Sequence, residues 1–478
     1  YIVEIYSGLL TMDKDTLQPA PDISETVPSP IFNSDGTVTY IFDIRRNVLF
    51  QDSSRQVTAQ DFKFSMERAL HPSTLSTISQ VFLGDIIGAI DFSRGNADEI
   101  SGIEVIDGFT LSITIDGPKP YFLSKLTNPP AFVVKREQVE DNPNGWSSNP
   151  IGTGPFRLSE WRLGERISLI PNQNFYLDPI PSVEKVTFLL AGGSALTMYE
   201  NDEIDATGVG INDIESIRDP NNPLNAELIE SPELSTFYIG FNAEKPPFDD
   251  PNVRRAFGMA IDRESLIKIV LKDLVEEAFG VIPPGMPGFN DNLAGIPFDP
   301  EEARKLISES KYGDSLPDIV LTSSGQGGTV GPILDTIIAM WKENLGINVD
   351  VEQSERALFM QDVDVGNVQV FDFGWIADYV DPQNFIEFKF YSKNIGTTND
   401  IRYNNPSVDS LIEEAQTEQD NDIRLKLYQN AEQIIIDDAA WIPLFHSKDA
   451  ILVKPYLEGF EATPLTLPVL RYISFKDQ

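Results

Sequence analysis

The sequence contains no cysteine and only two histidines among 478 residues. Without cysteine the chain forms no disulfide, no thiolate zinc site, no iron–sulfur cluster and no cysteine nucleophile. With His71 and His446 alone, a metal site built from several histidines is also excluded. We therefore expect neither a metal nor another cofactor.

Positive charge is also scarce, because 36 Lys and Arg residues stand against 74 Asp and Glu, which gives a net charge of −38. Such a chain repels phosphate groups, so nucleic acid is not an expected partner. With 41% hydrophobic residues and a length typical of two to four domains, it can nevertheless bury a large core. The composition thus indicates a folded acidic protein, which would suit a salty or extracellular setting.

Long apolar runs are absent, and none approaches the roughly 20 residues that cross a bilayer. No signal peptide is visible, yet the first ten residues (YIVEIYSGLL) already have the apolar character of a folded segment. We expect that a targeting segment has been trimmed, so its absence does not indicate the cytoplasm.

The elements that the sequence predicts alternate between strands and helices. In the first third, these are a strand at 38–44, a helix at 62–70 after a Thr58–Asp61 capping signal, and a hairpin at 102–115 around Asp107-Gly108. In the second half, strand 318–322, helix 332–344 and strand 346–351 form a βαβ pattern. Further helices are expected at 251–272, 299–309, 406–418 and 421–438, and the tail 463–478 is expected to return to the first domain. The chain is predicted to belong to the α/β class.

Enzymatic motifs are weak or missing. Residues 323–328 (Ser-Ser-Gly-Gln-Gly-Gly) follow a strand and precede a helix, but they match no phosphate-binding motif. The simpler interpretation is a flexible βα loop. The functional one is a loop that lines a ligand cleft, including Gln326, because such loops border the clefts of α/β folds. There is no GxSxG motif. A capping role is expected for His71, and a structural or cleft-lining one for His446. Paired carboxylates occur by chance among 74 acids, so a glycosidase dyad is left open without support.

The most informative stretch is 371–382, where aromatic and aliphatic residues surround Gly374 and acids follow. The simpler interpretation is an apolar strand that runs into an acidic turn. The functional one is a ligand-binding wall, in which Trp375 offers a stacking face and Asp378 holds a cationic group such as an ammonium. Gly374 would let the ligand approach the backbone closely.

Several segments, in order, resemble one family, the solute-binding proteins of ATP-driven importers of the oligopeptide/dipeptide class (extracellular solute-binding protein family 5). They span nearly the whole chain. Those that carry the resemblance are residues 5–10 (Ile-Tyr-Ser-Gly-Leu-Leu), 34–46, 58–68, 151–156 (Ile-Gly-Thr-Gly-Pro-Phe), 201–205, 241–263, 374–382 (Gly-Trp-Ile-Ala-Asp-Tyr-Val-Asp-Pro) and 404–409.

The resemblance implies a two-lobed periplasmic-binding-protein (Venus-flytrap) fold that closes on a ligand. The first lobe would comprise 1–17, 150–234 and 462–478, with an inserted subdomain at 18–149, and the second lobe 235–461. It also implies a monomeric extracytoplasmic protein, not an enzyme, which captures a peptide or peptide-like solute in the interlobe cleft. The solute would be delivered to membrane-embedded permease subunits. A lipid anchor at a removed N-terminus would hold the protein in the periplasm or at the outer face of the membrane.

Residue by residue, the resemblance assigns Asp378 to the ligand's ammonium, Gly374 and Ile376 to backbone pairing with an extended peptide, and Trp375 to a side-chain pocket. Further expected cleft residues are Tyr6, Asn242, Gln326 and Tyr403. Arg356 could bind a carboxylate or be a solvated helix arginine. Asp372 departs from relatives that carry a basic residue there.

Two other functions are left open by the residues. Aromatic side chains among many acids suit a binding protein for an oligosaccharide or another small solute. A hydrolase that uses a carboxylate pair is the second alternative.

Overall fold

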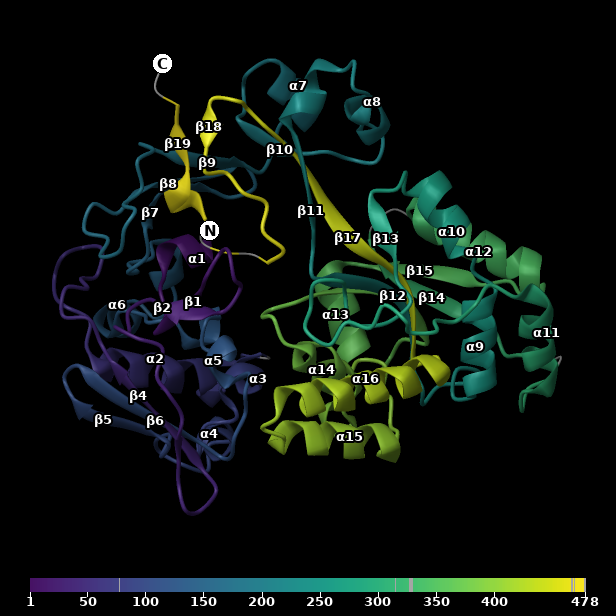
Figure 1. Ribbon diagram of the computed structural model, residues 1–478, viewed down its shortest axis with the longest axis horizontal. Coiled ribbons are helices and arrows are strands. Elements are labelled where there is room, and N and C mark those ends of the chain that lie inside the picture. Colours follow the sequence, from purple (N-terminus) through teal and green to yellow (C-terminus); the bar gives the residue numbers. More distant parts are fainter. Residues whose placement is uncertain (77, 314, 326–329, 466, 468, 477–478) are drawn as a thin grey trace. The chain divides into compact units, whose positions relative to one another are not determined.

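The computed structural model describes the whole chain except residues 77, 314, 326–329, 466, 468 and 477–478. The chain separates into two compact units (Figure 1): unit 1 comprises Tyr1–Gly208 and Ile451–Gln478, and unit 2 comprises Val209–Ala450. The C-terminal segment Ile451–Gln478 belongs to unit 1. The predicted lobe limits and the inserted subdomain at 18–149 stay predictions.

Unit 1 is built on small antiparallel sheets. One has the strand order β3 (Ile31–Phe32), β4 (Val38–Asp43), β6 (Thr110–Ile115) and β5 (Ile103–Asp107), and another has the order β7 (Phe156–Arg162), β8 (Arg166–Pro171) and β9 (Val186–Leu189). The turn between β5 and β6 confirms the hairpin predicted at Asp107-Gly108. The other helices and strands of unit 1 are α1 (Ile2–Ile5), β1 (Leu10–Met12), β2 (Pro19–Pro21), α2 (Ala59–Leu70), α3 (Ser79–Leu83), α4 (Ala89–Ser93), α5 (Phe122–Lys125), α6 (Arg136–Asp141), α7 (Ala195–Glu200), β10 (Ala206–Gly208), β18 (Leu457–Glu458) and β19 (Ser474–Phe475).

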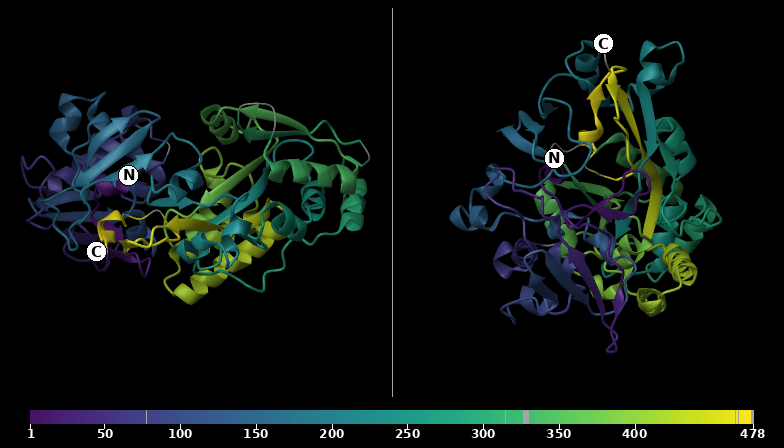
Figure 2. Two further views of the ribbon diagram at one scale, coloured as in Figure 1. Left: turned by 90° about the horizontal axis from the view of Figure 1, so that it is seen from above. Right: turned by 60° about the vertical axis from the view of Figure 1, so that its left-hand side comes forward.

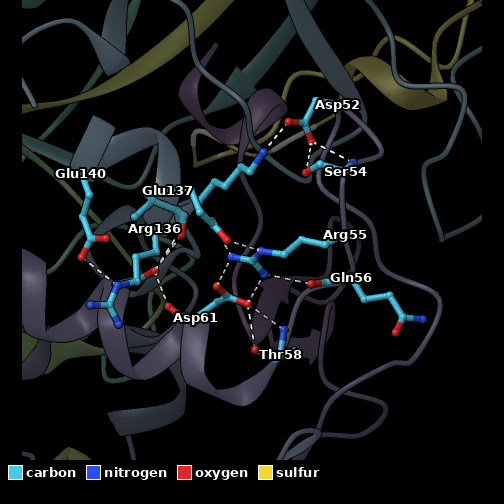
Figure 3. Close-up of polar contacts among 12 residues, drawn as sticks. Asp52, Ser54, Arg55, Gln56, Thr58, Asp61, Arg136, Glu137 and Glu140 are labelled. Atoms are coloured by element: carbon cyan, nitrogen blue, oxygen red, sulfur yellow. Dashed lines mark hydrogen bonds and ion pairs between the residues drawn. The ribbon is translucent and has the colours of Figure 1, made fainter. Parts of the chain in front are cut away.

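A charged cluster joins α2 to α6 in unit 1 (Figure 3). The predicted capping signal is present, since the Thr58 backbone N–H donates to Asp61 Oδ2 at 2.9 Å. The Arg55 guanidinium donates to both Asp61 oxygens, at 2.6 and 2.8 Å, and to both Glu137 oxygens, at 2.7 and 2.8 Å. Arg55 thus joins the start of α2 to Glu137 of α6, which lies 82 residues after Arg55 in the sequence.

Unit 2 is organised around a mixed sheet with the order β17 (Trp441–Val453), β12 (Ser235–Phe241), β16 (Val370–Ile376), β14 (Val320–Ser324) and β15 (Asp350–Ser354). Strands β14 and β15 are parallel and joined by α12 (Pro332–Leu345), which confirms the predicted βαβ unit. The neighbours β12 and β16 are antiparallel. The other elements of unit 2 are α8 (Ile214–Arg218), β11 (Leu228–Pro232), α9 (Pro251–Met259), α10 (Arg263–Ser265), β13 (Val275–Glu277), α11 (Pro300–Glu309), α13 (Arg356–Asp364), α14 (Ile386–Phe390), α15 (Pro406–Thr417) and α16 (Asn421–Asp437).

Helices cover both faces of this sheet. Successive residues of a strand point to opposite faces, so the side chains of the strands pack against helices on either side. On one side, the Phe241 ring of β12 lies 6.2 Å from the Phe257 ring of α9, which in turn packs on α12. On the other side, the Phe373 ring of β16 lies 6.2 Å from the Phe359 ring of α13. The predicted helices α15 and α16 pack side by side beneath α14 (Figures 1 and 2).

One predicted helix is wrong. The span 251–272 was expected to be continuous, but α9 ends at Met259 and a new helix starts after Asp262, whose carboxylate accepts the N–H of Ser265 at 3.0 Å. A π-helical turn follows at Leu266–Val270. A capping side chain in mid-span therefore interrupts the apolar periodicity. Over the part of the chain that is described, no helix has the length and apolarity of a membrane span.

Candidate functional site

The site centres on β16 and the turn that follows it. The register between β14 and β16 ends at the pair Thr322 and Phe371, whereas β12 accompanies β16 as far as Ile376. Within the described residues, the second edge of β16 therefore has no strand partner over 373–376. An unpaired strand edge offers N–H and C=O groups to another extended chain.

The Asn384 side chain holds this region in shape. Its Oδ1 accepts the backbone N–H of Asp378 at 2.9 Å and the indole N–H of Trp375 at 3.3 Å. Its Nδ2 donates to Asp378 Oδ2 at 3.2 Å. Because Asn384 is fully buried, one amide fixes both the ring and the carboxylate of the predicted site.

The Asp378 carboxyl is partly buried, and its environment disfavours the charged form. Burial raises its pKa to about 6, although the hydrogen bond from Asn384 and the charge of Lys389 act in the opposite direction. A ligand ammonium at this position would replace part of the lost solvation. The arrangement can thus hold a cationic group.

The turn itself is anchored by a buried ion pair. Arg424 of α16 donates to the two Asp381 oxygens at 2.7 and 3.0 Å, and the Asp381 side chain also accepts the N–H of Gln383 at 3.0 Å. The neighbouring Tyr379 is fully buried and its hydroxyl donates to Gln383. Asp381, although close in sequence to Asp378, is therefore part of the scaffold.

The structure gives a reason for glycine at position 374 that differs from the expected close approach of a ligand to the backbone. A β-carbon at this position would lie 2.5 Å from the ring of Phe237, its cross-strand partner on β12. The glycine is therefore required by Phe237 and does not by itself open space for a ligand. The neighbouring Ile376 side chain is 44% exposed, and Trp375 is partly exposed.

Two predicted site residues are buried and bonded within unit 2. The Asn242 amide donates to the carbonyls of Gly366 and Val368, at 3.0 and 3.1 Å, and is 1% exposed. Tyr403 is 3% exposed, and its hydroxyl donates to Asp438 Oδ2 at 2.5 Å. The structure gives both side chains packing roles, so their contact with a ligand stays a prediction.

The remaining predicted residues lie elsewhere. Arg356 is exposed at the first residue of α13. Tyr6 lies in unit 1, where its ring meets that of Trp146 edge-on at 6.4 Å and burial raises its pKa. Gln326 lies outside the described residues. Asp372 lies on β16, and burial raises its pKa as well.

Both histidines have hydrogen-bond partners within their own unit. His71 accepts the N–H of Ser73 at 3.2 Å, which confirms its capping role. His446 is 4% exposed and makes contacts with Ser235 O and Thr236 Oγ1 at 2.9 and 3.0 Å. Burial lowers its pKa to about 4, so it is neutral at pH 7. In the part of the chain that the structure covers, no three His, Asp or Glu side chains gather as metal ligands.

Sequence reasoning missed two residues of this region, Asn384 and Lys389. Both are buried polar residues in the segment 383–390 after the Asp381-Pro382 turn, where polar residues alternate with Phe and Ile. That contrast was a usable signal, since buried polar side chains are normally bonded.

Comparisons with known proteins extend over the whole chain. The family model for bacterial extracellular solute-binding proteins, family 5, matches residues 19–397. The periplasmic oligopeptide-binding protein OppA of Escherichia coli is 29% identical over 96% of this chain and 84% of its own length. Two solved structures have the same fold: an oligopeptide-binding protein of Borrelia burgdorferi (27% identical, TM-score 0.86) and the E. coli murein tripeptide-binding protein MppA (26%, TM-score 0.83).

Each of these structures aligns with 99% of this chain, and the alignment covers 94% and 93% of their own chains, respectively. The likeness confirms the expected two-lobed periplasmic-binding-protein fold. Because the family model covers well over half of the sequence, membership does not depend on any single motif. The chain belongs to the bacterial extracellular solute-binding proteins of family 5.

Proposed function

We propose that the protein captures extended peptides by their amino termini and delivers them to an ATP-driven importer. The observation that carries this proposal is the strand edge of β16 at 373–376, which lacks a partner among the described residues and leads directly to the Asp378 carboxyl. Addition of a peptide to a strand edge gives affinity through main-chain hydrogen bonds and is largely independent of ligand sequence.

Within this proposal, Asp378 binds the ligand's terminal ammonium. The raised pKa of Asp378 supports the role, because a buried carboxylate gains most from a well-placed cation. Gly374 and Ile376 supply main-chain groups for pairing, and the partly exposed ring of Trp375 contacts a ligand side chain.

Other residues take lesser roles. Exposed Arg356 is proposed to attract the ligand's carboxylate, and Tyr6 to contribute an aromatic edge from unit 1. Asn242 and Tyr403 support the site from within the packing of unit 2.

We further propose that the protein works without catalysis, as a monomer, outside the cytoplasm and held there by a lipid anchor. Similarity to a family of binding proteins supports the first point, and two relatives are named as periplasmic. Importer permease subunits at the membrane are the proposed partners. Peptide as the ligand class is supported by the names of OppA and MppA.

The test combines native mass spectrometry with thermal shift and calorimetry. The purified protein is first analysed for a retained ligand, then titrated with di- to hexapeptides, their N-acetylated forms and oligosaccharides. We expect stabilisation by free peptides and at least about tenfold weaker binding of the acetylated forms. Stabilisation by sugars alone would replace the ligand class, and turnover of any peptide would contradict a non-catalytic role.

A further inference from the structure

The short helix α14 carries a lysine in an unusual setting beside the proposed site. Lys389 is only 3% exposed, and every residue of α14 is buried. Lysine is almost never fully buried unless its ammonium is paired. The Lys389 ammonium inside unit 2 therefore needs a partner that offsets its lost solvation.

Asp400 fixes the position of this cation. Lys389 Nζ lies 2.7 Å from Asp400 Oδ2, and the Tyr238 hydroxyl donates to the same oxygen at 3.2 Å. Both side chains of the ion pair are at most 5% exposed. The ammonium thus stays in one place, unlike that of a surface lysine.

The same ammonium lies against the aromatic ring of the candidate site. Lys389 Nζ is 4.6 Å from the centre of the Trp375 ring and 5.9 Å from that of Phe373. A cation within about 6 Å of a ring centre is attracted by the ring's π-electrons. Asn384 and Phe388 fix the indole from other directions, the latter with 5.2 Å between ring centres.

We propose that Lys389 is a specificity-determining residue, which makes the Trp375 pocket select an uncharged ligand side chain, aliphatic or aromatic, over a cationic one. The Trp375 indole already interacts with the Lys389 ammonium. A lysine or arginine side chain of the ligand would therefore meet a ring that another cation already contacts, with a like charge nearby. This inference rests on the proposed peptide-binding role of Trp375. It concerns the ligand's side chain, whereas Asp378 serves its terminal ammonium.

The test uses pairs of peptides that are identical except at one position, where one member carries lysine and the other norleucine. Across the set of pairs, this position varies from 1 to 4. Dissociation constants are measured by calorimetry at pH 7.5 for the wild type and for Lys389→Met/Asp400→Asn, which removes both charges together and leaves no unpaired buried ion. Lys393→Met is the matched control, because Lys393 is on the next segment, exposed and paired with Glu413 at 2.8 Å.

We expect the wild type to prefer norleucine about tenfold at one position, because the Trp375 ring already faces the Lys389 ammonium at 4.6 Å. The double variant should reduce this preference to within about threefold. A change at Asp378 caused by the loss of the Lys389 charge acts on both members of a pair and cancels from their ratio. Lys393→Met should behave as the wild type. Should the double variant not fold, Lys389→Gln/Asp400→Asn retains a hydrogen bond between the two side chains and serves in its place.

Two outcomes would overturn the inference: a wild type that binds both members of every pair equally, or a preference that persists in the charge-free variant. Failure of the proposed function is distinguishable, since the wild type would then bind no peptide of either kind.

Discussion

The turn after β16 in unit 2 and the Arg55 cluster in unit 1 both hold acidic side chains, but their surroundings have opposite effects on the negative charge. Asp378 at the turn is partly buried, whereas the Glu137 side chain in the cluster is 52% exposed. In the cluster, hydrogen bonds from Arg55 lower the pKa of Glu137 to about 2, so its charged form is favoured (Figure 3). At the turn, burial raises the pKa of Asp378 to about 6, and its partner Asn384 is neutral.

This difference separates a structural cluster from a binding site. A carboxylate whose charge is satisfied within the fold contributes to stability and has little to gain from a ligand. A carboxylate whose charge is penalised by burial gains when a cation arrives. The contrast supports the proposed ammonium-binding role of Asp378 over one for an ion-paired acid such as Glu137.

The largest expected effect comes from Asp378→Asn, which keeps the shape of the side chain and removes its charge. Affinity for peptides with a free amino terminus should fall about 30- to 1000-fold, the range for truncating one partner of a buried charge pair. Calorimetry with free and acetylated peptides measures the difference. Asp61→Asn, a change in the Arg55 cluster, should lower Tm but leave affinity unchanged. An equal loss for both kinds of peptide would remove the ammonium role from Asp378.

Acidification should reproduce this loss in the wild type. Below the Asp378 pKa of about 6, the carboxyl becomes neutral while a peptide ammonium stays charged, so affinity should fall up to tenfold per pH unit. Titrations at pH 4.5, 5.5, 6.5 and 7.5 test this. The slope should vanish in Asp378→Asn, and a slope that remains there would assign the titration to another group.

Asn384→Ala should have a smaller effect on binding, about tenfold, because it releases both Trp375 and Asp378 without removing either. Asn405→Ala is a suitable control, since it removes the N-cap of α15 and a hydrogen bond to Asp438 in the same unit. Affinity and Tm are measured for both variants. If the two lower affinity equally, the effect of Asn384 is one of general stability.

Arg55→Met should affect stability alone. It leaves the buried Asp61 carboxylate without its guanidinium, and we expect Tm to fall by about 4–8 °C at pH 7. Because the pKa of Glu137 is lowered in the folded state, the contribution of its charged form to stability is fully present above about pH 4.5. This contribution is lost as the pH falls toward 2. The Tm difference between variant and wild type should therefore shrink at pH 3. A change in peptide affinity would contradict a purely structural role for the Arg55 cluster.

The smallest effect concerns Glu432, a third kind of buried acid. Its Oε1 accepts the N–H groups of Val281 and Ile282, at 2.7 and 2.8 Å, and burial raises its pKa to about 7. A raised carboxyl pKa means that stability falls as the pH rises from about 4.5 to 7. Glu432→Gln should thus raise Tm by about 2–4 °C at pH 8 and leave it unchanged at pH 4.5. Thermal scans at both pH values measure this, and an equal shift at both would contradict it.

Local patterns predicted most of the fold. The Thr58–Asp61 capping box, the hairpin at Asp107-Gly108 and the βαβ unit around α12 are all present, because neighbouring residues specify each of them. The continuous helix predicted at 251–272 was wrong for a local reason as well. The Asp262 carboxylate caps a new helix in the middle of the apolar repeat on which the prediction depended.

The candidate site was predictable only in part. The sequence proposed Trp375 and Asp378 by their chemistry and by a family resemblance, but it did not predict that packing against Phe237 also requires glycine at position 374. Asn384 was missed because its importance arises when the turn folds back on β16. Lys389 was missed because its partner Asp400 and the Trp375 ring meet it only in the folded unit.

By itself, the sequence determined what depends on composition and short-range order: the absence of thiol chemistry, the α/β class, the capped helices and turns, and the family motifs. Tertiary structure decided in which acids an ion pair stabilises the charged form and in which burial destabilises it. That distinction depends on partners remote in sequence, such as Arg55 with Glu137, and on desolvation by surrounding elements. Pairing and burial of charge are set by distances that chain order does not contain, so only the folded units separate Asp378 from ion-paired acids such as Glu137.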